Sequence, residues 1–272
     1  MRKKRMYMLI MMIPFLAGLV SVFIVYYSNI SYYKPAKKHG KHIFVSREKD
    51  DTIRVGYIGD SWAALHESRN NMLESWLTKA SGKSVIVRSA GLGGLTSKEI
   101  YDSLFTNTKM NTIVEWEPDF CFVSAGINDA NKKMGRVFYK ENMRLIISLF
   151  LENNITPVIM EIPDYDIWFS FKRMIFPNKL RAVRSMLWTH SLLDCIDDYV
   201  SAYNELLDEQ HWHNQVITIR KEQWNPGGFK DKRGLYLEDR MHLNEKGYSF
   251  LDSCVAFEIA KYMIASDHRY GD

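Results

Sequence analysis

From residue 52 onwards, short apolar runs alternate with amphipathic stretches, and this alternation constrains the fold more than any other feature of the sequence. Five runs have the character of strands: Ile53–Ile58, Ser84–Arg88, Phe120–Val123, Thr156–Met160 and Gln215–Ile219. The stretches with helical character are Asn70–Ala80, Lys98–Phe105, Tyr139–Asn153, Val200–Glu209 and Glu245–Ile264. This order predicts a central parallel sheet with helices on both faces, a three-layer α/β/α sandwich. Ligands bind such sheets at the carboxyl ends of the strands, so a functional site is expected there.

The N-terminal segment is of a different kind. Arg2–Arg5 precedes an apolar run from Met6 to Tyr27 that no charge interrupts. About 20 apolar helical residues span a bilayer, so we predict a cytoplasmic basic tip and a transmembrane signal anchor over residues 1–27. The tip would keep the N-terminus cytoplasmic and place the rest of this single-pass protein outside the cytoplasm. The alternative is a cleaved signal peptide, whose apolar core is shorter, about 7–15 residues. Residues 28–51 are predicted to form a basic stem before a domain at 52–272.

The charge of the chain is unevenly distributed, which bears on its partners. The net charge is +4, yet residues 1–49 hold ten Lys and Arg residues against one acidic residue, so the remaining chain is acidic. A nucleic-acid-binding domain concentrates positive charge on the fold itself, so no nucleic-acid partner is expected. The three cysteines are odd in number and form no CxxC pair, which indicates neither a disulfide framework nor a zinc site.

Polar residues suited to acyl transfer follow the predicted strands. Ser61 comes directly after the first strand, where converging backbone N–H groups suit a nucleophile. Gly94 lies in a glycine-rich turn after the second strand, and Asn128 follows the third with an amide that can donate into the same crevice. Asp239 and His242 precede the last helix, and their spacing lets the carboxylate orient an imidazole that takes a serine proton. Each segment alone is typical of a turn, but their joint occurrence in this order indicates a catalytic site.

These four segments resemble the sequence blocks of the SGNH (GDSL-type) hydrolase family over roughly residues 53–262. The resemblance implies a flavodoxin-like α/β/α domain in which Ser61 is the nucleophile, His242 the general base and Asp239 its partner. It also implies an oxyanion hole made of the Ser61 and Gly94 backbone N–H groups and the Asn128 side chain, with no metal and no organic cofactor.

The sequence departs from the family pattern in the second block. Ser89 stands where that block usually opens with Asn. Gly91 and Gly93 compete with Gly94 for the oxyanion role, and Gly94 is preferred because it directly precedes Leu-Thr-Ser.

The resemblance implies a serine esterase that acts on small acyl esters, often acetyl groups on carbohydrate. Together with the predicted anchor, it favours an acylated cell-surface or secreted glycan, or a small acylated molecule, as substrate. A glycan O-acyltransferase would use the same residues, with a sugar hydroxyl in place of water. A non-catalytic glycan-binding protein on the same fold is the third hypothesis.

Two further features, His66 and the segment 164–198, lie outside these four blocks. His66 has no neighbouring Asp in the sequence, so we expect it at the rim of the site or at a helix start. The segment 164–198 is aromatic and basic and matches none of the family's blocks. A connection of this length is usually functional or disordered, and this one is predicted to be a lid or insertion over the strand ends. It can be a core-covering flap, a membrane-facing lid or an acceptor site, and the sequence does not decide among them.

Overall fold

A computed structural model describes residues 12–23, 32–40 and 51–270, with side chains up to residue 266. The chain consists of two compact units, residues 1–35 and residues 36–272. The first contains a helix over residues 12–23. The predicted span Met6–Tyr27 extends on both sides beyond the described residues. Among the described helices, none has the length and apolar character needed to cross a membrane.

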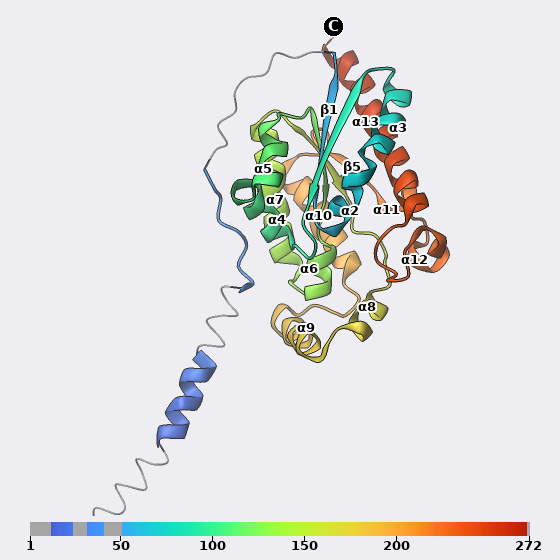
Figure 1. Ribbon diagram of the computed structural model, residues 1–272. Coiled ribbons are helices and arrows are strands. Elements are labelled where there is room, and N and C mark those ends of the chain that lie inside the picture. The colour runs from blue at the N-terminus through green and yellow to red at the C-terminus, as the bar shows by residue number, and fades with distance from the viewer. Residues whose placement is uncertain (1–11, 24–31, 41–50, 271–272) are drawn as a thin grey trace, which may run out of the picture. The chain divides into compact units, whose positions relative to one another are not determined.

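The larger unit is built on a five-stranded parallel sheet with the strand order β2-β1-β3-β4-β5 (Figure 1). The strands are β1 Ile53–Gly59, β2 Val85–Gly91, β3 Phe120–Ser124, β4 Thr156–Met160 and β5 Ile217–Ile219. Every residue of β3 and all but one of β1 are buried, as expected for parallel strands covered on both faces. The chain runs from the inner strand β1 to β2 on one side and then to β3 on the other. The carboxyl ends of these strands therefore form a topological switch point, where ligands bind in such sheets.

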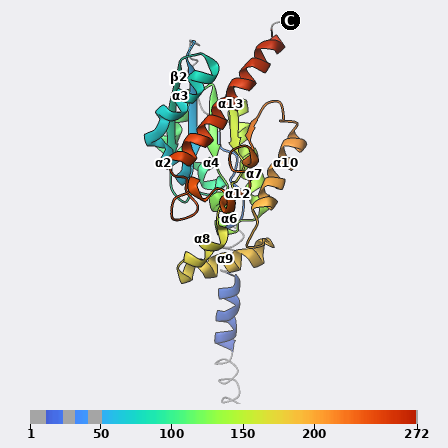
Figure 2. The same cartoon turned by 90° about the vertical axis from the view of Figure 1, so that its right-hand side faces the viewer.

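Helices cover both faces of the sheet, which confirms the predicted three-layer α/β/α fold. One layer pairs α3 with α13, and the other contains the contacting helices α4, α5, α7 and α10 (Figures 1 and 2). The helices of these layers are α3 Asn70–Ser81, α4 Ser97–Thr106, α5 Thr108–Glu115, α7 Arg136–Glu152, α10 Ile196–Gln210 and α13 Glu245–Tyr270. Figure 2 views the face that α13 crosses, where Leu251, Val255 and Ile259 are fully buried.

Further helices, all short except α9, occupy the connections at the carboxyl edge of the sheet. They are α2 Ser61–His66, α6 Ile127–Lys132, α8 Ile167–Arg173, α9 Phe176–Thr189, α11 Lys221–Trp224 and α12 Gly228–Asp231, with 3-10 turns η1 Glu67–Arg69 and η2 Arg233–Leu235. Figure 1 shows α8 and α9, which make up most of the predicted lid segment 164–198, beyond α6 at this edge.

Part of the predicted stem belongs to the folded domain. The backbone N–H of Ala36 donates to Asn142 Oδ1 on α7, and His39 contacts both Tyr101 and Asp102 on α4. Residues 36–40 therefore lie against the helical layer, although the sequence pattern there shows only a polar linker. Residues 28–31 and 41–50 of the predicted stem lie outside the described residues.

Candidate active site

The end of β1 presents Ser61 as the first residue of α2. Asp60 caps this helix, because its carboxylate accepts the backbone N–H of Trp62 at 3.0 Å. The turn depends on glycine: a Cβ at Gly59 would lie 2.3 Å from the carbonyl oxygen of Ser124. A Cβ at Gly91 would likewise lie 2.1 Å from the backbone nitrogen of Ala64. The two glycines therefore let the ends of β1 and β2 close tightly around the serine.

The loop before α13 brings His242 to Ser61. His242 Nε2 lies 2.7 Å from Ser61 Oγ, and His242 Nδ1 lies 2.6 Å from Asp239 Oδ2. The other oxygen of Asp239 accepts the backbone N–H groups of Met241 and His242 at 3.0 and 2.9 Å. Partial burial opposes ionisation of Asp239, but the ring and backbone hydrogen bonds from His242 outweigh it and lower the pKa of this carboxyl. Residues 181 positions apart thus form a continuous Ser–His–Asp chain of hydrogen bonds.

Asn128 lies in the first turn of α6, at the end of β3, and is half-buried. Its Nδ2 donates to Asp60 Oδ2 at 3.1 Å, so the carboxylate that caps α2 also orients the amide. Because the amide has two N–H groups, the second is left to donate to a substrate. The adjacent Asp129 is buried and accepts the backbone N–H and the hydroxyl of Ser97, at 2.8 and 2.5 Å. This pair links the Asn128 turn to the glycine-rich loop.

In that loop, Gly94 has a left-handed φ of +80°, and its carbonyl oxygen accepts a hydrogen bond from Lys132 Nζ. Gly93 is placed so that a Cβ there would lie 4.0 Å from the Ser61 Cβ. The loop therefore reaches the nucleophile, and the assignment of the Gly94 N–H to an oxyanion hole stays a prediction.

Residues 57–250, well over half of the chain, match the GDSL-like Lipase/Acylhydrolase family. The chain belongs to this family. Members of the GDSL-like family are carboxylic ester hydrolases, so the reaction class follows at that level.

Solved structures share the fold at low sequence identity. The lipase/acylhydrolase from Enterococcus faecalis is 16% identical, with a TM-score of 0.53 over 77% of this chain and 96% of that one. A variant of an acetyl xylan esterase from Geobacillus stearothermophilus is 14% identical, with a TM-score of 0.54 over 76% and 94% of the two chains. A GDSL-like lipase from Bacteroides thetaiotaomicron is 18% identical, with a TM-score of 0.50 over 76% and 88%. No curated protein matches the sequence.

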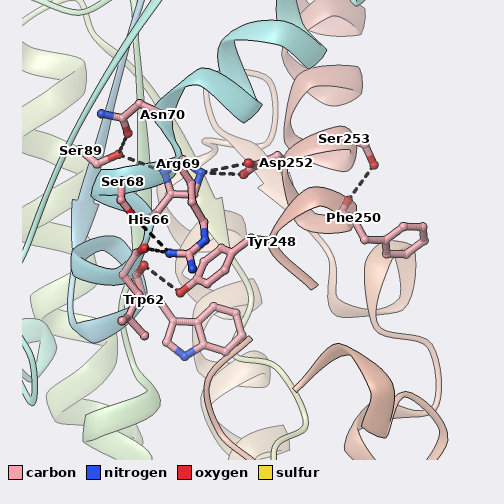
Figure 3. Close-up of polar contacts among 11 residues, drawn as sticks. Trp62, His66, Ser68, Arg69, Asn70, Ser89, Tyr248, Phe250, Asp252 and Ser253 are labelled. Atoms are coloured by element: carbon pink, nitrogen blue, oxygen red, sulfur yellow. Dashed lines mark hydrogen bonds and ion pairs between the residues drawn. The ribbon is translucent and has the colours of Figure 1, made fainter. Parts of the chain in front are cut away.

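A buried His–Asp pair, which the sequence did not reveal, supports the nucleophile helix of this GDSL-like domain (Figure 3). His66 is fully buried at the end of α2, and its Nε2 lies 3.0 Å from both carboxylate oxygens of Asp252 on α13. Its Nδ1 lies 3.2 Å from the hydroxyl of Ser89, which in turn donates to Asn70. The interpretation of His66 as a rim residue was therefore wrong, because an Asp distant in sequence orients it from the interior.

Helix α13 holds α2 at a second point. The hydroxyl of Tyr248 donates to the carbonyl oxygen of Trp62 at 3.0 Å, next to the nucleophile turn (Figure 3). The pair His66–Asp252 fixes the other end of the same helix. Two buried contacts thus set the direction of α2 and with it the position of Ser61.

The segment 164–198, predicted to be a lid, contacts the loop that carries His242. Asp166 caps α8 and also binds Arg240, with 3.0 Å between the carboxylate and the guanidinium. The guanidinium of Arg240 lies over the Phe169 ring, 4.0 Å from its centroid. A cavity of about 450 Å³ adjoins this contact, and its lining includes Trp168 together with several acidic and basic side chains.

In the described part of the chain, no group of three or more His, Cys, Asp or Glu residues is arranged to hold a metal ion.

Asp60 makes the stability of the fold depend on pH. Burial raises the pKa of Asp60 from its ordinary value of 3.8 to about 7. Because the pKa is higher in the folded than in the unfolded state, the folded protein binds this proton more tightly. Protonation of Asp60 therefore stabilises the fold below pH 4, and this stabilisation is lost as pH rises through 7.

We therefore expect Asp60→Asn, which stays neutral, to gain stability relative to the parent as pH rises. The gain between pH 4 and pH 8 should be up to about 4 kcal/mol, the equivalent of the pKa difference. Urea unfolding of both proteins at several pH values measures it. The charge of Asp129 also acts on Asp60, so loss of this repulsion is part of the expected gain. A stability difference that does not change with pH would contradict the prediction.

Proposed function

We propose that this protein is a serine esterase that removes small acyl groups, acetyl above all, from carbohydrate outside the cytoplasm. The observation that carries the proposal is the unbroken hydrogen-bond chain from Ser61 Oγ through His242 to Asp239, with distances of 2.7 and 2.6 Å. Nucleophile, base and orienting carboxylate are within direct hydrogen-bond reach, which is the geometric requirement for nucleophilic acyl transfer.

The reaction would proceed in two steps. Ser61 Oγ attacks the ester carbonyl carbon while its proton moves to His242 Nε2, and Asp239 stabilises the resulting imidazolium. The oxyanion accepts hydrogen bonds from the Ser61 and Gly94 backbone N–H groups and from the free N–H of Asn128. His242 then gives the proton to the departing alcohol oxygen, leaving an acyl ester on Ser61. A water molecule, deprotonated by His242, hydrolyses this ester and restores the serine.

The cavity beside Arg240 supports a polar alcohol as the leaving group. Trp168 and Phe229 contribute aromatic surfaces, while Asp164, Asp197 and Lys221 contribute charged groups around the same space. A sugar can stack on the aromatic rings and hydrogen-bond to the charged groups. A site for a long acyl chain would instead be lined by aliphatic side chains.

The decisive experiment is labelling of the full chain with a fluorophosphonate, followed by assays on acetylated sugars and on lipid esters. We expect a label on Ser61, none on Ser61→Ala, and free acetate released from the sugars. Absence of a label on the folded protein would overturn the serine esterase. Labelling with turnover of lipid esters alone would overturn the carbohydrate substrate, and acetate transferred to a sugar instead of released would show a transferase.

Trp168 provides a test of the sugar site that does not touch the triad. Trp168→Ala should raise KM for an acetylated oligosaccharide about tenfold, the equivalent of roughly 1.4 kcal/mol, because it removes a stacking surface. Its kcat on a small activated acetate should not change. Trp188→Ala is the matched control, since Trp188 lies in the same segment but does not line the cavity. Equal effects of both substitutions would mean that the cavity does not bind the sugar.

We also propose that residues 1–27 anchor the protein in a membrane. The full chain should then fractionate with membranes, and removal of residues 1–35 should yield a protein that is soluble in high salt. Residues 36–40 are kept because they bond to α4 and α7. Cell fractionation with N-terminal sequencing checks this prediction. A soluble product shortened near residue 25 would instead indicate a cleaved signal peptide.

A further inference from the structure

Helix α9 carries its apolar residues on the side opposite to the protein interior. Phe176, Leu180, Val183 and Leu187 are spaced four, three and four residues apart, so they form one stripe along the helix. All four are exposed, Phe176 to 71% and Leu187 to 75%. The residues that the helix buries are small, Ala182 and Ser185. A helix on a soluble domain normally buries its large apolar side chains, so this stripe requires a partner.

The stripe continues onto α8 and has basic borders. We call the α8–α9 face the exposed apolar residues Trp168, Ile175, Phe176, Leu180, Val183 and Leu187, with the basic residues Lys172, Arg173, Lys179, Arg181 and Arg184. No Asp or Glu occurs between Asp166 and Asp194. In the part of the chain that the structure describes, none of these five basic residues forms an ion pair, and Arg173 lies over the Phe169 ring. The face therefore presents five positive charges without internal neutralisation.

The charge decides between the partners that an apolar face can have. A second copy of the chain would bring another set of the same five positive charges, which repel one another. The apolar N-terminal run follows the basic residues Arg2–Arg5 and adds no negative charge either. An anionic bilayer surface supplies both requirements, an acyl region for the stripe and negative headgroups for its borders.

We propose that the α8–α9 face is a docking site for a membrane surface containing anionic phospholipid. Leu180 and Leu187 enter the headgroup–acyl boundary, and Lys179 and Arg184 meet the phosphates on either side of the stripe. The face is tied to the catalytic loop, because Asp166 at the start of α8 binds Arg240. Docking therefore holds the carboxyl edge of the sheet, with Ser61, towards the membrane and restricts the enzyme to substrates near its surface.

Quenching of tryptophan fluorescence by brominated lipids tests the proposal on the full chain. The protein is incorporated into vesicles of brominated phosphatidylcholine, alone or mixed with phosphatidylglycerol. We expect quenching of Trp168, which belongs to the face, and of Trp188 at the end of α9, with the anionic mixture and little with phosphatidylcholine alone. Trp168→Phe/Trp188→Phe identifies the part of the signal that comes from this face. High salt should reduce the quenching, because headgroup attraction is screened.

Paired surface variants separate the two components of docking. Lys179→Glu/Arg184→Glu should weaken docking at least about 25-fold, since each basic residue near an anionic surface contributes about fivefold. Leu180→Ser/Leu187→Ser should abolish quenching without changing the circular dichroism spectrum. The matched controls are Lys79→Glu/Lys83→Glu on and after α3 and Phe257→Ser on α13, which should have no effect.

Four results would overturn the proposal. Equal quenching in neutral and anionic vesicles would remove the role of charge, and quenching that survives Leu180→Ser/Leu187→Ser would remove the role of the stripe. A dimer seen by light scattering without lipid, and lost in that variant, would make a second copy the partner. Protection of residues 167–189 from hydrogen exchange by soluble dextran sulfate, with no quenching by vesicles, would make the partner an anionic glycan.

Discussion

Ser61→Ala should abolish ester cleavage and leave the fold intact, with a loss of kcat on the order of 10⁶. The hydroxyl is the only atom lost, and its environment in the parent is polar and half-exposed, so no cavity forms in the core. His242→Ala should cost a similar factor because the two side chains act as a unit. The double variant should be no slower than either single variant, since losses within one hydrogen-bonded unit do not add.

Turnover of an acetyl ester, measured with circular dichroism on the same samples, checks this prediction. Ser68→Ala is the matched control, because Ser68 lies seven residues further along the same connection and contacts Arg69 instead of His242. Parental turnover by Ser61→Ala, or strict additivity with His242→Ala, would show that these residues are not the nucleophile and base.

The sheet was predictable because the strands are marked by local pattern. Parallel strands covered on both faces are continuous apolar runs, so Thr156–Met160 was predicted with its observed bounds and the other strands within a few residues. The candidate site followed from the same cause. In a parallel sheet, residues that follow successive strands lie at one edge. Ser61, Gly94 and Asn128 could therefore be placed together from the strand pattern alone, without knowledge of the tertiary contacts.

Contacts between distant segments left no signal in the sequence. His66 was misinterpreted because the Asp that orients it is 186 residues away on α13, inside a helix with an ordinary core pattern. The link between Asp60 and Asn128 spans 68 residues and was invisible for the same reason. Helix α9 escaped prediction because its exposed residues are apolar and its buried ones small, which inverts the pattern by which surface helices are recognised.

Asn128→Ala should lower kcat by about 10²–10³ and leave KM nearly unchanged, the usual result of losing one oxyanion donor. Its amide already donates one N–H to Asp60, so the other can bind the charge that develops on the carbonyl oxygen. Steady-state kinetics on a small acetate ester separates the two parameters.

Asn131→Ala is the matched control on the same helix, because the Asn131 side chain accepts a hydrogen bond from Tyr165 and contacts Met241. That variant should lose stability but retain kcat. A rise in KM alone for Asn128→Ala would make Asn128 a substrate-binding residue, and the oxyanion hole would then consist of backbone N–H groups.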